Sequence, residues 1–317
     1  ADDIIAAIAH PFEIDGEIVH LTASVGIARF PDDAGSATEL LTAADQAMYV
    51  AKASGRNRAM MFNPSIKQAV NEKSKLIGAL QETLQDQSFD LHFQPIVDLK
   101  TNQITKAEAL LRWSHPETGP IPPCQFIPLA EEVGLIGAVG DWVFEHCCQA
   151  IPLLQSRYGA DFQLGMNVSP LQLTPREDTT QIWLDRLQQH GVAGKSLIVE
   201  ITESALLEQN GFVVDRLEAL QTAGIQLALD DFGTGYSSMS YFLQHQIDYL
   251  KIDREFVRHL PSAPKAATLC RTMTELAHRL GVKVIAEGIE TPEQRTFLTG
   301  IGADFGQGFL LSPPMSM

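Results

Sequence analysis

Short apolar runs, most of them closed by a polar side chain, repeat along the chain from residue 88 onward. There are eight, and they read LHFQPIVDL, ITKAEALLRW, FQLGMNVS, SLIVEITE, IQLALDD, YLKID, VKVIAEG and GQGFLLS. Segments with apolar residues at helical spacing separate the later runs: TPREDTTQIWLDRLQQHG, GFVVDRLEALQTAGI, AATLCRTMTELAHRLGV and TPEQRTFLTGIG. Eight strands that alternate with helices predict an α/β fold, a TIM-like (β/α)8 barrel.

The first two runs depart from this alternation. Only KTNQ separates them, and four residues leave no room for the helical crossover that joins parallel strands. They should therefore form a hairpin, so the barrel is predicted to have an antiparallel first strand.

A different pattern precedes the barrel. Residues 1–9 are predicted to be helical, FEIDGEIVHLTASVGIARF to form a hairpin with Asp15-Gly16 at its turn, and ATELLTAADQAMYVAKASG to form a helix that Gly55 ends. Residues 1–63 thus predict part of an α/β sandwich. An amphipathic helix within residues 64–87 connects it to a second domain over residues 88–317.

Polar residues, all but one of them with side-chain oxygen donors, close several of the barrel strands. They are Asn167, Glu200, Asp230 with Asp231, Lys251 and Glu287. Successive positions are 21 to 36 residues apart, enough for one strand and one helix, so their side chains should meet at the C-terminal face of the barrel. Oxygen ligands without a histidine pair favour Mg²⁺ or Mn²⁺ over zinc.

Composition narrows the function classes. The formal charge is −16, from 39 acidic and 23 basic residues with no basic run, which argues against long nucleic acid as a partner. A small anionic substrate is compatible with this charge if metal ions offset the local acids. The four cysteines form no C-x-x-C pair and are expected to be reduced and buried. No apolar run is long enough to cross a membrane, which predicts a cytoplasmic protein and leaves open an anchor upstream of this chain.

The second strand carries EALLRW at residues 108–113, which resembles the motif of EAL-domain phosphodiesterases. The resemblance extends over residues 85–317, where FQPIVDL, FIPLAEEVGLI, NVSP, EITES, DDFGTGYSS, LKID and AEGIE follow the family pattern in order. Members of this family hydrolyse the bacterial second messenger cyclic di-GMP. The resemblance therefore implies a metal-dependent hydrolase.

The resemblance also implies roles for individual residues. One divalent ion is coordinated by Glu108, Asn167, Glu200 and Asp230, and a second by Asp230, Asp231 and Glu287. Two such ions, Mg²⁺ or Mn²⁺, can activate water for attack on a phosphodiester. The catalytic group implied in this way comprises Lys251, Glu287, Glu108 and Asp231.

Further residues are expected to support that group. Lys251 either orients the attacking water or, if its pKa is depressed, accepts a proton. Glu203 is expected to anchor the DDFGTGYSS loop, and Asp253 to lie behind the ligands. Substrate contacts are implied for Gln94, Arg112 and Gln307.

The N-terminal segment has a resemblance of its own. TASVGIARFPDD and LLTAADQAMYVAKASGRNRAMMF look like the C-terminal part of a GGDEF diguanylate cyclase domain. Residues 1–62 contain no GGDEF loop, so cyclase activity is not expected of this chain.

The predicted function is hydrolysis of cyclic di-GMP to linear pGpG. Two alternatives stay open: a cyclic di-GMP receptor that does not hydrolyse it, and a regulated, weakly active enzyme. A homodimer through the loop and helix at residues 231–243 is the expected assembly.

Overall fold

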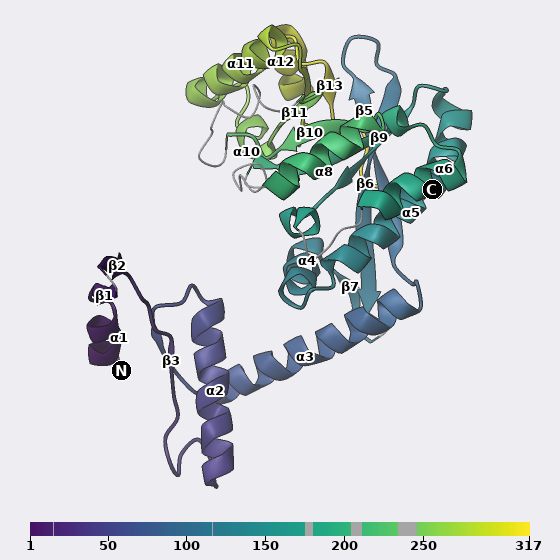
Figure 1. The fold of residues 1–317 in the computed structure, drawn as a ribbon. Coiled ribbons are helices and arrows are strands. Elements are labelled where there is room, and N and C mark those ends of the chain that lie inside the picture. The colour runs from purple at the N-terminus through teal and green to yellow at the C-terminus, as the bar shows by residue number, and fades with distance from the viewer. Residues whose placement is uncertain (15, 116, 175–179, 204–210, 234–245) are drawn as a thin grey trace. The chain divides into compact units, whose positions relative to one another are not determined.

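The structure is a computed structural model of residues 1–317, and it describes all of them except residues 15, 116, 175–179, 204–210 and 234–245 (Figure 1). The chain divides into two compact units, Ala1–Leu80 and Gln81–Met317. No helix among the described residues combines the length and hydropathy that a bilayer span requires.

The first unit contains two separate pairs of strands. Strands β1 (Phe12–Ile14) and β2 (Glu17–Val19) form an antiparallel hairpin, as predicted. Asp15, at its predicted turn, lies outside the described residues. Strand β3 (Val25–Ile27) does not continue this hairpin but pairs in parallel with β4 (Ala59–Met61).

The predicted hairpin is therefore confirmed only over residues 12–19, and its extension to residue 30 is wrong. The packing of helix α2 (Ala37–Ala53) supplies the physical reason. A side chain at Gly26 would collide with the backbone of α2 at Ala44 and Met48, so β3 lies directly against this helix. The helix serves as the crossover that two parallel strands need. Its N-terminus is capped by Ser36, and Gly55, with φ +104°, follows its end as predicted.

Two further helices of this part of the chain match the predicted positions. Helix α1 spans Asp2–Ile8 and α3 spans Pro64–Gln85. The division between the two units falls inside α3, after Leu80. The domain boundaries expected at residues 63 and 87 stay predictions.

The second unit is a closed barrel of eight strands, which confirms the predicted fold class. The β5–β6 hairpin and the β13–β5 pair are antiparallel, and the other neighbours around the barrel are parallel. The short KTNQ connection thus joins two antiparallel strands, as predicted. In order around the barrel the strands are β5 (Asp90–Asp98), β6 (Ile104–His115), β8 (Gln163–Asn167), β9 (Leu197–Thr202), β10 (Gln226–Asp230), β11 (Tyr249–Ile252), β12 (Lys283–Ala286) and β13 (Phe305–Gly306).

The last strand is shorter than predicted. The run GQGFLLS was expected to be extended over residues 306–312, but β13 ends at Gly306 and residues 309–311 form a turn. The backbone of Gly308 approaches Ile289 so closely that a side chain there would collide with it. A short strand β7 (Gly119–Ile121), which the apolar pattern did not indicate, pairs with the far end of β6.

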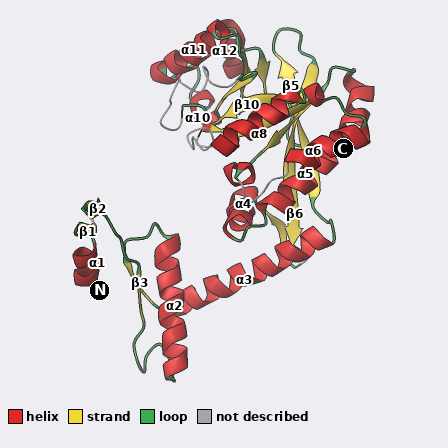
Figure 2. Ribbon diagram, in the orientation of Figure 1, coloured by secondary structure: helices red, strands yellow, loops and turns green. Residues whose placement is uncertain are grey.

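Helices surround the barrel (Figure 2). They are α4 (Pro123–Glu132), α5 (Ile136–Tyr158), α6 (Thr180–His190), α8 (Gly211–Thr222), α10 (Arg254–Val257), α11 (Pro264–Arg279) and α12 (Pro292–Ile301). The predicted helices are present, although residues 175–179 of the first one lie outside the described residues. Cys147, Cys148 and Cys270 are free and buried as expected, whereas Cys124, at the start of α4, is free but exposed.

The N-terminal end of the barrel interior holds a polar layer around Lys106. Its ammonium donates to Oε1 of Gln163, 2.7 Å away, and lies 4.3 Å from the ring centroid of Phe305. Tyr249 also donates to Oε1 of Gln163, at 2.9 Å. Burial, and then the charge of Lys283, lower the pKa of Lys106 to about 8.

This lysine makes stability depend on pH. Its folded pKa lies below its unfolded value, so the unfolded chain binds more protons between about pH 8 and 10.5, and stability rises with pH in that window. The shift corresponds to roughly 3 kcal/mol. We expect Lys106→Met to remove most of this rise, because methionine has no ammonium group to titrate; Tyr249 still donates to Gln163 in this variant. Urea unfolding at pH 7.5 and 9.5 measures it, with tryptophan fluorescence as the probe.

All three tryptophans, Trp113, Trp142 and Trp183, belong to the second unit, so fluorescence follows the barrel alone. Lys265→Met, at an exposed position on α11, is the control and should keep the wild-type pH dependence. Parallel stability curves for wild type and Lys106→Met would contradict the assignment.

Candidate active site

Four carboxylates converge on one ammonium group at the C-terminal end of the barrel. Lys251 Nζ lies 2.6 Å from Glu287 Oε1, 3.2 Å from Asp230 Oδ2 and 3.6 Å from Glu108 Oε2. It also contacts Glu200 Oε2. The lysine side chain is 1% exposed, so this is a buried ion cluster.

The strands position these groups. Asp230 is the last residue of β10, Lys251 is next to last in β11, and Glu287 directly follows β12. The backbone N–H of Glu287 donates to the carbonyl of Ile252 at 3.0 Å, which continues the pairing of β12 with β11. Because the carboxyl ends of parallel strands share one face, the sequence brings these side chains together as predicted.

The cluster shifts the pKa values of its members. Burial acts to lower the pKa of Lys251, but the charges of Asp230, Glu108, Glu200 and Glu287 outweigh it and hold the pKa well above its ordinary value. Burial raises the pKa of Glu287 to about 8, against the attraction of Lys251. Lys251 is therefore charged at neutral pH, which favours the electrostatic role over that of a proton acceptor.

Negative charge remains in excess, and its chemistry fits a hard divalent cation. Oε1 of Glu200 is buried and has no hydrogen-bond partner. Across the described part of the chain, no three acidic, histidine or cysteine side chains stand as a preformed ligand set, and Lys251 lies among the carboxylates instead. Oxygen donors, surplus charge and an unsatisfied buried carboxylate oxygen are the properties that Mg²⁺ or Mn²⁺ requires of a site.

The two other expected ligands lie beside this cluster. Asn167 is exposed at the end of β8, and its Nδ2 donates to Glu108 Oε1 at 2.6 Å. Asp231 has a left-handed backbone, with φ 54°, and its N–H donates to Asp230 Oδ1 at 2.9 Å. Burial and then the charge of Asp230 raise the pKa of Asp231, so its carboxylate shares the same electrostatic field.

The two supporting acids have identifiable contacts. Glu203 accepts a long hydrogen bond of 3.4 Å from the N–H of Gly233, consistent with an anchor for the loop that begins at Asp231. Asp253 caps α10 by accepting from the N–H of Glu255 at 2.8 Å. Residues 234–243 of the expected dimer segment lie outside the described residues.

The expected substrate contacts divide into two groups. Gln307 Nε2 donates to Glu108 Oε2 at 2.7 Å and to Gln94 Oε1 at 2.9 Å, so both glutamines adjoin the carboxylates. Arg112 instead donates to the carbonyl of Leu111 at 3.0 Å. Among the described residues, no contact joins its guanidinium to the cluster.

A pocket of about 230 Å³ opens at this end of the barrel. Gln94, Glu108, Asp230, Glu287 and Gln307 line one part of it, and Arg254, Gly288, Glu290, Gly308 and Phe309 line the rest. The second set was not predicted. The available signal was adjacency in sequence, since Arg254 follows the KID motif and Gly288 and Glu290 lie within AEGIE. Gly288 has φ 67°, and a side chain there would collide with Arg254.

The sequence profile of the EAL domain matches residues 77–314, about three quarters of the chain. The chain belongs to the EAL domain family. The profile described as diguanylate cyclase, GGDEF domain, matches residues 1–58.

The EAL chain is also similar to named proteins. The bifunctional diguanylate cyclase/cyclic di-GMP phosphodiesterase MucR of Pseudomonas aeruginosa is 37% identical over 99% of this chain and 46% of its own length. The cyclic di-GMP phosphodiesterase PdeR of Escherichia coli is 35% identical over 99% of this chain and 47% of its own. The chain thus spans about half the length of these curated relatives.

Solved structures support the same fold. The PaMucR phosphodiesterase in complex with c-di-GMP has a TM-score of 0.72 and 37% identity, covering 76% of this chain and 98% of that one. The EAL enzyme Bd1971, bound to cAMP and cyclic-di-GMP, has a TM-score of 0.74 and 33% identity, covering 78% of this chain and 68% of that one.

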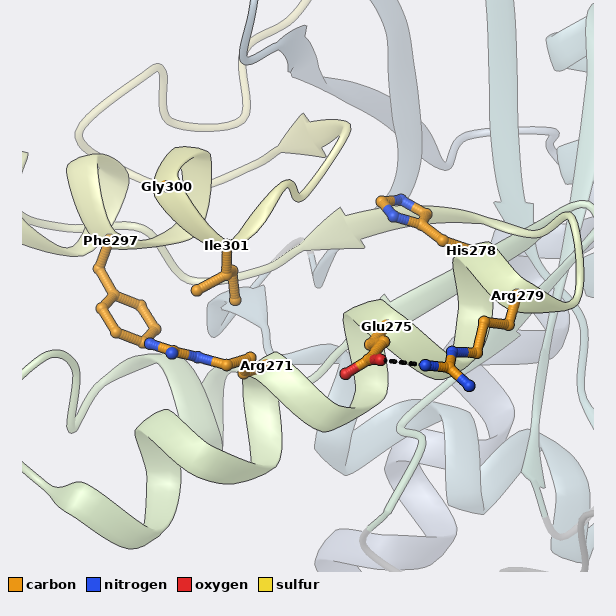
Figure 3. A pocket seen from close by; sticks show the side chains of 7 residues that line it. All are labelled: Arg271, Glu275, His278, Arg279, Phe297, Gly300 and Ile301. Atoms are coloured by element: carbon orange, nitrogen blue, oxygen red, sulfur yellow. Dashed lines mark hydrogen bonds and ion pairs between the residues drawn. The ribbon is translucent and has the colours of Figure 1, made fainter.

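A larger hollow of about 750 Å³ lies between α11 and α12 of the EAL barrel (Figure 3). Its charged groups have partners already: Glu275 pairs with Arg279 at 2.6 Å, and His278 pairs with Asp304 at 2.8 Å. Arg271 lies over the ring of Phe297. Since no cluster of unsatisfied groups converges there, the smaller pocket is the candidate active site of the EAL domain.

The buried ion cluster makes Lys251 important for stability when no metal is present. Lys251→Met leaves the four carboxylates without their common partner, and breaking a buried pair costs about 3–5 kcal/mol. We expect that loss at pH 9, where Glu287 is ionised, measured by urea unfolding in EDTA with tryptophan fluorescence.

The loss should shrink at pH 6.5, because Glu287, whose raised pKa is about 8, then takes up a proton and loses its charge, and burial favours the same change for Glu200. Lys195→Met, which removes an exposed pair with Asp161, is the control and should change stability by less than about 0.5 kcal/mol. An equal loss for Lys251→Met at both pH values would show that charge repulsion is not its cause.

Proposed function

We propose that this chain hydrolyses one phosphodiester bond of cyclic di-GMP and releases linear pGpG, with two Mg²⁺ or Mn²⁺ ions. The observation that carries the proposal is the excess of carboxylates around Lys251, with an unsatisfied oxygen of Glu200, at the pocket of an EAL barrel. Relatives named cyclic di-GMP phosphodiesterases support the choice of substrate.

The metal ligands follow from the family resemblance and the positions at the strand ends. Glu108, Asn167, Glu200 and Asp230 would hold one ion, and Asp230, Asp231 and Glu287 the other. Bound ions of this kind supply Lewis acidity to a phosphoryl oxygen and to the attacking water.

The protein's own residues would position and stabilise the reacting groups. Lys251 is held in its charged form, so it donates hydrogen bonds and offsets negative charge that develops on the phosphoryl oxygens. Gln94 and Gln307, joined to each other and to Glu108, would hold the substrate beside the carboxylates. Arg112 would contact phosphate after turning its guanidinium from the Leu111 carbonyl.

Two other functions remain distinct from this one. A receptor would bind cyclic di-GMP without releasing product, and a regulated enzyme would release it slowly until activated. Retention of every expected ligand type favours hydrolysis. Chromatography of the nucleotides formed by the purified chain with Mg²⁺ separates the three, since a receptor leaves cyclic di-GMP intact.

We also propose self-association through residues 231–243, because a partner against this segment would restrain Asp231 and the loop that Glu203 anchors. Specific activity should then fall on dilution as the dimer dissociates.

Metal dependence is the direct test of the proposed chemistry. Stripping the protein with EDTA should abolish pGpG formation, and Mg²⁺ or Mn²⁺ should restore it. Ca²⁺ should fail to restore it, because that larger ion takes six to eight ligands at longer distances. Product formation is measured by chromatography of the reaction mixture.

Asp230→Ala should lower the rate at least 100-fold even with added Mn²⁺, since it removes a carboxylate assigned to both ions. Asp161→Ala, at an exposed surface position, is the matched control. Undiminished turnover in EDTA would refute the two-ion proposal.

Arg254 supplies a second recognition element in the pocket. Cyclic di-GMP carries two phosphodiester groups, and the carboxylate and lysine centre can take only one of them. Arg254 lines the same pocket, is exposed, and makes no ion pair with any described residue. A guanidinium in this position suits the phosphate that is not attacked.

We expect Arg254→Ala to raise KM for cyclic di-GMP by about 10- to 100-fold, the equivalent of one hydrogen bond to a charged group, with kcat within a few fold. Hydrolysis of bis(p-nitrophenyl) phosphate, which has a single phosphate, should be unchanged. Arg258→Ala, at the C-cap of the same helix but paired with Glu255, is the control. An equal loss of activity with both substrates would show that Arg254 does not bind the second phosphate.

A further inference from the structure

The segment that follows β8 is built to hold Asn167 in place. Asn167 is exposed, and its amide reaches Glu108 at 2.6 Å. The next residue, Val168, donates its backbone N–H to the carbonyl of Glu200 at 2.9 Å. The orientation of Asn167 therefore depends on how the chain is fixed immediately after it.

Ser169 is fixed by three hydrogen bonds. Its hydroxyl donates to Oε1 of Glu131 at 2.6 Å and accepts from the N–H of Leu171 at 3.3 Å. Its own N–H donates to Oε1 of Gln172 at 3.0 Å. A hydroxyl has one proton to give, and here it goes to a carboxylate, which makes the bond to Glu131 the charge-assisted one.

Gln172 ties the same turn to the helices behind it. Its side chain is 3% exposed and lies where a side chain at position 140 would stand, so glycine at that position leaves room for the Gln172 amide. The backbone carbonyl of Gln172 accepts a hydrogen bond from Nη1 of Arg216 at 3.1 Å. The turn is thus held by α4 through Glu131, by α5 through Gly140 and by α8 through Arg216.

Helix stability does not explain the carboxylate of Glu131. It lies in the last turn of α4, near the negative end of the helix dipole, where an acid is unfavourable by about 0.3–1 kcal/mol. Among the described residues, Glu131 makes no ion pair that would offset this cost. Its side-chain hydrogen bond there is the one from Ser169.

We propose that Glu131 is a positioning residue for the metal site: through Ser169 it fixes the turn that orients Asn167 toward the carboxylates. The inference rests on the function proposed above, in which Asn167 is a metal ligand. Partners that orient ligands from behind typically contribute 10- to 100-fold to metal affinity.

The test measures metal binding without substrate. Mn²⁺ is titrated into metal-free protein and the free ion is followed by electron paramagnetic resonance. Glu131→Ala should raise the Kd for Mn²⁺ about 10-fold or more. Glu131→Gln should stay within about threefold of wild type, because its amide oxygen still accepts the Ser169 proton. Glu218→Ala, an exposed glutamate on α8, is the control.

A double-mutant cycle identifies the route. Ser169→Ala alone should weaken Mn²⁺ binding at least as much as Glu131→Ala, because it also removes the acceptor for the Leu171 N–H. The double variant should weaken binding no more than Ser169→Ala, because the bond to Glu131 is already lost. Thermal unfolding establishes that each variant is folded. In a folded Glu131→Ala, saturating Mn²⁺ should restore kcat, as expected when only metal affinity is weakened.

Two results would overturn the proposal: unchanged Mn²⁺ affinity in a folded Glu131→Ala, or additive losses in the double variant. Failure of the proposed function looks different, because wild type would then bind Mn²⁺ and leave cyclic di-GMP intact. If wild type releases pGpG and Glu131→Ala binds Mn²⁺ normally, only the role of Glu131 is lost.

Discussion

The contact between the ammonium of Lys251 and four carboxylates is the interaction on which the barrel's C-terminal face depends. Charges buried this deeply are costly unless paired, and the paired groups come from strands distant in sequence. The closed barrel makes the pairing feasible because it fixes each strand end relative to the others. The long strand β6 contributes as well, since it carries Glu108 well before its own end, at the level where its neighbours stop.

Two buried lysines show how strongly surroundings govern charge within one barrel. Lys251 and Lys106 are both almost fully buried, yet the pKa of the first is raised and that of the second is lowered to about 8. The difference lies in their neighbours, because carboxylates surround Lys251 whereas aromatic rings and amides surround Lys106. One end of the barrel thus gathers charged groups that stabilise one another, whereas at the other end burial disfavours the charged form of Lys106.

The sequence predicted the barrel and the central cluster because both depend on periodicity. Strand ends recur at the spacing of a strand and a helix, so Glu200, Asp230 and Glu287 had to meet. The other wall of the pocket escaped prediction because it consists of loops. The place of Arg254 depends on the left-handed backbone of Gly288, and that of Phe309 on the early end of β13. Likewise, Glu131 and Ser169 meet only because α4 packs near the end of β8, which no local pattern reveals.

The ion cluster around Lys251 is not the arrangement that would best stabilise the fold. Its charge instead affects the order in which cations and a nucleotide could bind. Well-packed apolar residues in place of buried ion pairs often make a protein equally or more stable. The carboxylates also outnumber the ammonium four to one, in a chain whose formal charge is −16. A dinucleotide with two phosphates would be repelled by such a surface unless cations were already bound there. Since Arg254 and Lys251 together cannot neutralise both the site and such a substrate, the proposed function requires cations to bind before or with the nucleotide. Under that proposal, the acidic pocket would repel anions in general and admit those that can coordinate bound metal ions.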